Sequence, residues 1–107
     1  MAIYKNISVT ASTSTDTLIA KNRDKGDQGN ISKILIANSD DTGNQEPTVN
    51  IYLDDGTNQY YFIRDIVIPI GTTLVLDDNV GFNAGVFDLK ASTTIASGTA
   101  KLSIIIK

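Results

Sequence analysis

The sequence predicts an all-β fold, an antiparallel β-sandwich of jelly-roll type with about eight strands. About eight runs rich in Val, Ile, Thr and Tyr alternate with clusters of Gly, Asn, Asp and Pro, which commonly end strands. A βαβ scaffold would instead alternate strands with longer helical patterns. The chain has 107 residues, which suffice for one domain with a single hydrophobic core.

The beginning of the chain differs in pattern from the rest. Ile7, Val9 and Ala11 alternate as strand residues do, whereas residues 11–15 (ASTST) are small and polar. We interpret residues 1–16 as an N-terminal arm or a first strand, and residues 17–107 as the sandwich domain. An arm of small polar side chains buries little area, so we expect it to be poorly ordered unless a neighbour covers it.

Two predicted strands follow, separated by a polar loop. Thr17–Lys21 (TLIAK) is predicted as a short strand, and residues 22–30 (NRDKGDQGN) as a loop because Gly and polar residues dominate it. In the next strand, Ile31–Asn38 (ISKILIAN), residues 34–37 are apolar on both faces. This pattern is typical of a central strand of a sandwich or of a strand at an interface.

A β-hairpin is the clearest local prediction. After the polar connection 38–47, Val49, Ile51 and Leu53 alternate with polar residues and Tyr52. Residues 54–58 (DDGTN) have the composition of a tight turn, in which a glycine can adopt positive φ. The partner strand is predicted at Gln59–Ile68 (QYYFIRDIVI).

The tyrosines of this hairpin have two interpretations. Tyr52, Tyr60 and Tyr61 cluster on the predicted sheet surface. Aromatic pairs commonly stabilise antiparallel hairpins by cross-strand packing. Exposed aromatic side chains can also bind sugars or proteins.

Three further strands complete the predicted sandwich. Pro69 lacks an N–H donor, so the chain should turn and leave its sheet before the strand at Thr73–Leu76. Residues 79–85 are predicted as a crossing, Val86–Ser92 as a half-exposed strand and Ala100–Lys107 as the last strand. The alternation assigns one set of side chains to the core: Val49, Ile51, Leu53, Phe87, Leu89, Leu102, Ile104 and Ile106.

The composition argues against most enzymatic and ligand-binding classes. His, the usual general base, and Cys are both absent, and the adjacent Asp pairs lie in predicted turns, where Asp favours local hydrogen bonds. We therefore expect no catalytic, cofactor-binding or metal site. The net charge is −3 and the basic residues form one small island, Lys21, Arg23 and Lys25, so we expect no nucleic-acid partner.

Two weak motifs have ordinary explanations. Residues 24–30 (DKGDQGN) are rich in oxygen ligands but lack the spacing and final Glu of a calcium-binding EF-hand loop. Asn6 and Asn30 begin glycosylation-type triplets, which arise by chance in a chain rich in Asn and Ser. No run approaches the roughly 18 apolar residues of a membrane span, and no signal-peptide pattern begins the sequence. We expect a soluble, unprocessed chain with no membrane partner.

From Thr17 onward the sequence resembles small β-sandwich virion proteins of tailed bacteriophages. The resemblance rests on an Ile-rich strand ending in ANS, the hairpin NIYLDDGTNQYYFIRD and the segment VIPIGTTLVLDDNVGFNAGVFDLKAS. Val86 and Phe87 depart from the family pattern, in which an acidic residue is commoner after Asn-Ala-Gly. The resemblance implies a decoration, cement or joining role on a capsid, neck or tail, and it implies no active site.

These observations predict a non-enzymatic structural protein of a tailed-phage virion, assembled in the host cytoplasm. A capsid decoration or cement protein is favoured. The alternatives are a neck, head-to-tail joining or tail protein and, in another class, a carbohydrate- or receptor-binding module. The expected partners are the major capsid protein or other virion proteins and further copies of this chain, with a trimer slightly ahead of a dimer. Outward apolar or aromatic side chains are the candidate interface: Tyr52, Tyr60, Val75 and Ile105.

Overall fold

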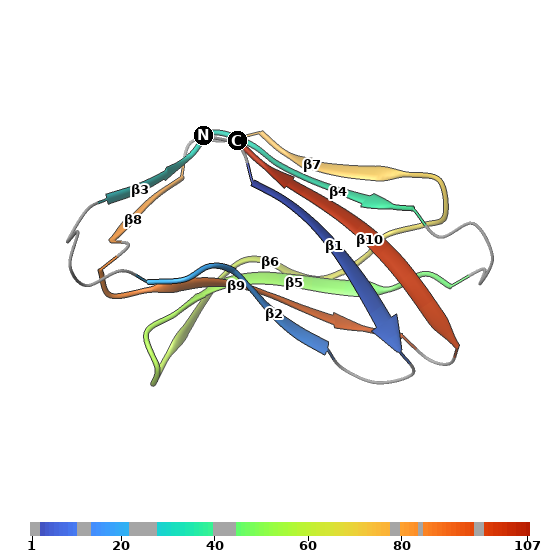
Figure 1. Cartoon of the computed structure of the whole chain (residues 1–107), viewed down its shortest axis with the longest axis horizontal. Helices are drawn as coiled ribbons and strands as arrows, with labels where there is room; N and C mark the ends of the chain where they lie inside the picture. The colour runs from blue at the N-terminus through green and yellow to red at the C-terminus, as the bar shows by residue number, and fades with distance from the viewer. Residues whose placement is uncertain are drawn as a thin grey trace.

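Alternating apolar residues build two four-stranded antiparallel sheets in the computed structural model, which describes residues 3–10, 14–21, 28–39, 45–77, 80–83, 85–95 and 98–107. Every regular element of these residues is a strand, so the all-β prediction is confirmed (Figure 1). The strands are β1 (Ile3–Thr10), β2 (Ser14–Ile19), β3 (Gln28–Ile31), β4 (Ile34–Asn38), β5 (Thr48–Asp54), β6 (Gln59–Val67), β7 (Thr73–Leu76), β8 (Val80–Asn83), β9 (Asp88–Thr94) and β10 (Thr99–Ile106).

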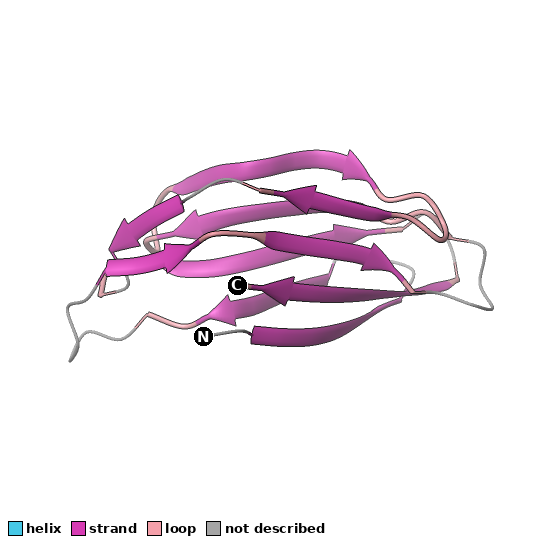
Figure 2. Ribbon diagram, turned by 90° about the horizontal axis from the view of Figure 1, so that it is seen from above, coloured by secondary structure: helices cyan, strands magenta, loops and turns pink. Residues whose placement is uncertain are grey.

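The strand order is that of a jelly roll. One sheet, here called sheet A, has the order β1-β10-β4-β7, and the other, sheet B, has the order β2-β9-β5-β6. The chain therefore changes from one of these sheets to the other between β1 and β2, β2 and β4, β4 and β5, β6 and β7, β7 and β9, and β9 and β10. This is the wrapped arrangement of two Greek keys. Figure 2 shows that the strands run roughly along the long axis of the molecule.

A small third sheet extends sheet A at one end. β3 pairs with β8, and these two strands continue the β4–β7 pair along the chain (Figure 1). The sequence had predicted one strand over Ile31–Asn38, but the strand breaks at Ser32 and Lys33, whose N–H groups both bond the carbonyl of Lys107. Residues 79–85 were predicted as a crossing and include β8, so that prediction is wrong for Val80–Asn83.

The hairpin and the change of sheet after it are confirmed. β5 and β6 pair through the turn at residues 55–58, where Gly56 has a φ of 98° and the Asp55 carboxylate accepts N–H bonds from Thr57 and Asn58. β6 ends at Val67, immediately before Ile68 and Pro69, and β7 joins sheet A. The missing N–H of Pro69 explains why the ladder stops there.

The core lies between the two sheets and matches the predicted set closely. Ile51, Leu89, Leu102 and Ile104 are completely buried, and Val49, Leu53 and Ile106 are also in the core. Phe87 is a correction, because it lies before β9 begins and is only partly buried against the core. In all, burial of aliphatic side chains from both sheets holds the sandwich together.

Residues 3–10 form part of sheet A. β1 pairs with β10 in continuous register from Ile3 to Thr10, and its Ile7 and Val9 side chains are buried. β2 begins at Ser14, ahead of the expected domain start at Thr17. Residues 1–16 were interpreted as an N-terminal arm or a first strand, and residues 3–10 of this segment form a strand. The division at residue 17 stays a prediction.

Candidate functional site

An apolar row crosses the outer face of sheet A. The register of the four strands aligns Tyr4 of β1 with Ile105 of β10, Ile105 with Leu35 of β4, and Leu35 with Val75 of β7. These positions alternate with the buried residues of each strand, so their side chains lie on the face away from the core. We call these four residues the apolar row.

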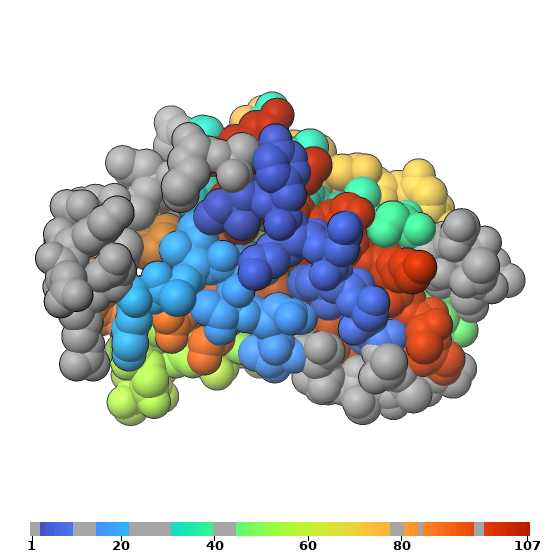
Figure 3. Space-filling model, in the orientation of Figure 1, coloured from blue at the N-terminus to red at the C-terminus, as the bar shows by residue number. Residues whose placement is uncertain are grey.

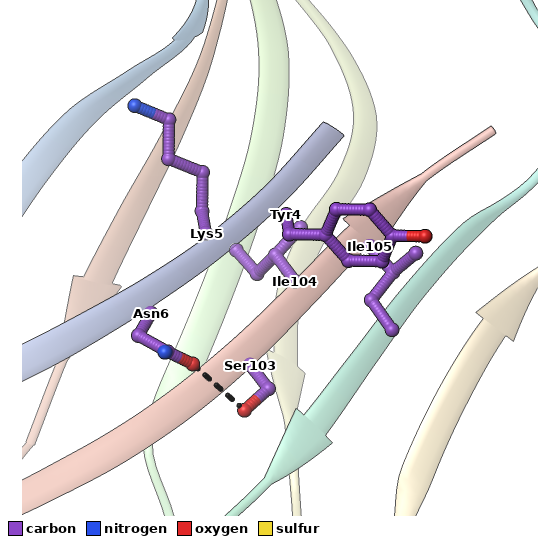
Figure 4. Close-up of a pocket in the computed structure, with 6 residues that line it drawn as sticks. All are labelled: Tyr4, Lys5, Asn6, Ser103, Ile104 and Ile105. Carbon is purple, nitrogen blue, oxygen red and sulfur yellow. Dashed lines mark hydrogen bonds between the residues drawn. The ribbon is translucent and has the colours of Figure 1, made fainter. Parts of the chain in front are cut away.

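The apolar row is accessible to solvent in this chain. Tyr4 is 71% exposed, the highest value among the exposed large apolar side chains, and Val75 is 48% exposed. Ile105 and Leu35 are half-buried. Figure 4 shows the Tyr4 ring beside Ile105. A contiguous row of this kind is typical of a surface that contacts another molecule.

Polar and basic side chains border the apolar row on both sides. The adjacent row contains Asn6 and Ser103, and the Ser103 hydroxyl donates to Asn6 Oδ1 at 3.1 Å (Figure 4). Lys101 lies beyond that row, whereas Lys33 and Lys107 pair on the opposite side. An apolar centre with a polar rim is the usual composition of a protein interface.

A shallow depression lies at one end of the row. It has a volume of about 260 Å³ and is lined by residues of β1 and β10: Tyr4, Lys5, Asn6, Ser103, Ile104 and Ile105. Small-molecule sites usually occupy about 300–1,000 Å³ and enclose most of the ligand. The depression is therefore better suited to part of a protein contact than to a small ligand.

The outer face of sheet B has a different character, because its polar and aromatic groups bind one another. Lys90 Nζ and Asp54 Oδ2 are 2.9 Å apart across β9 and β5. This bond lowers the pKa of the Asp54 carboxyl and raises that of the Lys90 ammonium. Thr, Ser and Asn occupy much of the remaining outer face, at Thr15, Thr17, Asn50, Ser92 and Thr94.

Aromatic packing on sheet B buries Tyr52 and leaves Tyr61 40% exposed. The Tyr52 and Tyr61 rings are 5.1 Å apart, and the Arg64 guanidinium lies 4.9 Å from the centre of the Tyr61 ring. Burial raises the pKa of Tyr52 above its usual value of 10.0. Both neighbours contact the Tyr61 ring, which reduces the area of that ring available to stack on a sugar.

The candidate interface residues therefore do not form one surface. Val75 and Ile105 lie together in the apolar row, but Tyr52 is on sheet B and only 5% exposed. The outward assignment of Tyr52 follows from alternation, and its exposure is lost because Tyr61 and Lys90 flank it. Tyr60 is 53% exposed at the far end of the β5–β6 hairpin, where its ring meets Phe87 edge-on.

Sequence reasoning missed Tyr4 and only partly identified Leu35. The apolar pattern of residues 34–37 indicated an interface strand or a central strand, and β4 is a central strand of sheet A with Leu35 on its outer face. Tyr4 carried no signal, because its neighbours across the row become adjacent only through strand order. That order depends on contacts between residues distant in the sequence.

Chemistry other than contact has little support in the described residues. No group of three or more His, Cys, Asp or Glu side chains in that part of the chain is positioned to hold a metal ion. The oxygen-rich loop 24–30 lies mainly outside the described residues. The described residues also contain no helix with the length and apolarity of a membrane span.

The fold has counterparts among solved structures. The chain aligns with a crystal structure of PirA at a TM-score of 0.67 and 12% identity, covering 98% of this chain and 94% of that chain. It aligns with a chain in the structure of the infectious bursal disease virus Gt strain at a TM-score of 0.59 and 15% identity, covering 99% of this chain but 32% of that chain.

A third similar structure belongs to the Bacillus endospore appendages, described as a family of disulfide-linked pili. Its TM-score is 0.50 at 20% identity, with coverage of 99% of this chain and 84% of that chain. No protein-family model matches the chain, and no curated protein matches it either. At these identities the likeness concerns the fold alone. The chain thus has an antiparallel, jelly-roll-like sandwich fold that also occurs in a viral structure.

Proposed function

We propose that this chain is a non-enzymatic structural protein of a tailed-phage virion and that it decorates or cements the capsid. The observation that carries the proposal is the apolar row of Tyr4, Ile105, Leu35 and Val75 on an open sheet face. Burial of such a row against another protein is favourable by about 25 cal/mol per Å² of apolar area. The row thus supports a role that depends on contact between proteins.

The rest of the molecule is consistent with a contact role. The core is filled by aliphatic side chains, and on sheet B Lys90 bonds Asp54 while Arg64 lies over the Tyr61 ring. The fold is shared with a chain of a virus structure, and this analogy supports a virion role. The resemblance of residues 17–106 to small phage sandwich proteins points to the same class.

The proposed partners are the major capsid protein, or another virion protein, and further copies of this chain. A standard interface buries about 800 Å² on each partner, which is a sizeable part of the 6064 Å² accessible surface of this chain. Lys33, Lys101 and Lys107 around the row favour a partner surface with acidic groups at its rim. Sheet B would then face away from the capsid.

The test is the composition and structure of the parent virion. Quantitative peptide analysis of purified particles should find this chain in a copy number comparable with that of the major capsid protein. Cryo-electron microscopy should show the outer face of sheet A against the capsid shell. Absence from the particles would refute the virion role, whereas a copy number of a few per particle would identify a neck or tail protein instead.

A further inference from the structure

The four sheet edges of the sandwich differ in how well they are protected from pairing. β7 has four residues, β2 shifts register between Thr17 and Ile19, and β6 shifts register on both sides of its pairing with Ile51. In β6, Asp65 also has a positive φ of 54°. Shortness and bulges are two means by which proteins prevent an edge from pairing with another chain.

β1 has neither of these protections. It spans eight residues and pairs with β10 without a register shift, and among the described residues β10 is its only ladder partner. Figure 3 shows β1, in dark blue, on the surface of the molecule. Its one charged side chain, Lys5, is exposed. Lys5 protects this edge through its charge alone, because the backbone around it remains regular.

The ladder shows which backbone groups of β1 face the open edge. Two backbone hydrogen bonds join Lys107 and Lys33: the Lys107 N–H donates to the Lys33 carbonyl at 2.9 Å, and the Lys33 N–H donates to the Lys107 carbonyl at 3.2 Å. The backbone groups of odd-numbered residues in β10 therefore point toward β4. Bonded and non-bonded pairs alternate in an antiparallel ladder, so the even-numbered residues of β10 bond β1. Their partners in β1 are Ile3, Lys5, Ile7 and Val9. The N–H and C=O groups of Tyr4, Asn6 and Ser8 therefore point away from sheet A.

We propose that β1 pairs with the β1 strand of a second copy of this chain, antiparallel about a twofold axis. An edge strand that meets its own copy around a twofold axis forms a self-complementary, closed contact. The two A sheets would then join into one continuous sheet of eight strands. This inference goes beyond the virion role, because it concerns self-association and holds wherever the dimer attaches.

The charges of β1 favour one register of this pairing. Centring the axis on Ile7 pairs Asn6 with Ser8 of the second copy and places Lys5 opposite Val9. The two Lys5 residues are then four positions apart along the strands, about 14 Å at about 3.4 Å per residue. That separation exceeds the Debye length of about 8 Å at physiological ionic strength, so their repulsion is largely screened.

The pairing also has a consequence for the apolar row. The twofold axis is normal to the sheet, so both outer faces point in the same direction. Each copy contributes its own row of Tyr4, Ile105, Leu35 and Val75 to that one face. A dimer would therefore present two rows to one partner surface, which raises binding through effective concentration.

The matched proline variants Ser8→Pro and Thr73→Pro test the pairing. Ser8 is exposed and its N–H points to the open edge, so proline there removes a bond to the second copy and none within the chain. Thr73, the first residue of β7, is likewise exposed with its N–H outward, because Asn38 N bonds the Thr72 carbonyl and sets that ladder. Sedimentation should give a dimer for the wild type and for Thr73→Pro, and a monomer for Ser8→Pro.

Hydrogen exchange of the wild type provides a measurement that needs no variant. The amides of Tyr4, Asn6 and Ser8 should exchange at least about tenfold more slowly at concentrations that favour the dimer than after dilution. The amides of Lys5 and Ile7 bond β10 in either state and should not change. The proposal is wrong if the wild type is a monomer or a trimer, or if Ser8→Pro is still a dimer. It is also wrong if dilution leaves the exchange rates of all three outward amides unchanged.

Discussion

The outer faces of the two sheets have different relations to water. On sheet A, the side chains of Tyr4, Ile105, Leu35 and Val75 form an apolar row with no described covering. On sheet B, Tyr52, Tyr61, Arg64, Lys90 and Asp54 contact one another through an ion pair, a ring pair and a cation–π contact. The difference teaches that aromatic residues in a sequence do not by themselves mark a binding surface. Whether an aromatic side chain is available for binding depends on the residues that it contacts within the fold.

The largest expected effect lies in the core, where the two sheets should behave alike. Ile51 of sheet B and Ile104 of sheet A are both completely buried. Ile51→Ala and Ile104→Ala should each reduce the free energy of unfolding by about 2–5 kcal/mol, since each leaves a cavity. Chemical denaturation measures both losses. If a variant unfolds like the parent, the side chain that it removes does not point into the core, and the faces of that strand are assigned wrongly.

The next effect should appear on sheet A alone. Ile105→Lys introduces a charge in the centre of the apolar row and should weaken attachment to the parent capsid by tenfold or more, because the few side chains that dominate an interface lie near its centre and contribute about 2 kcal/mol or more. Particles lacking the chain, mixed with purified variant, provide the binding measurement. Thr17→Lys, on the exposed outer edge of sheet B, is the matched control and should bind normally. Equal loss in both variants would remove the distinction between the faces.

A smaller effect is expected for the aromatic cluster of sheet B. Tyr61→Ala removes the contacts with Tyr52 and Arg64 and should cost about 0.5–1.5 kcal/mol of stability. Thermal unfolding measures this loss. Because these rings pack on each other, a glycan array should give no signal for the wild-type chain. Binding of a glycan that is lost in Tyr61→Ala would instead support the carbohydrate-binding alternative.

The smallest expected effect concerns the ion pair between Asp54 and Lys90. The hydrogen bond from Lys90 lowers the pKa of Asp54 below the usual 3.8, so the pair stabilises the fold above pH 3.8 and the gain is lost as pH falls through the lowered pKa. Asp54→Asn should therefore melt slightly below the wild type near neutral pH. The two melting temperatures should converge in acid. A difference that persists at the lowest pH would assign the effect to packing.

Much of the architecture could be predicted because it depends on local chemistry. Alternation along β5 and β10 identified the core faces, and the DDGTN turn with Gly56 at positive φ identified the hairpin. Pro69 marked the point at which the chain leaves sheet B. Each of these signals lies within a few residues of the element that it predicts.

The features that the sequence patterns did not predict have a common cause in contacts between distant residues. In β6, Tyr61 pairs with Tyr52 on the outer face while Ile63 pairs with Ile51 in the core, because the register shifts between them. Simple alternation would place both odd-numbered residues on one face. The strand β8 was missed for a related reason, since its four residues, VGFN, form a strand only by pairing with β3.

The sequence by itself determined that this protein is a β-sandwich with one aliphatic core, because strand period, turn composition and proline position act locally. Only the tertiary structure decided which outward side chains remain available. Strand order brings Tyr4, Ile105, Leu35 and Val75 into one row, and it covers Tyr52 with Tyr61 and Lys90. The physical reason is that exposure depends on neighbours across strands, and the pairing of strands distant in the sequence selects those neighbours.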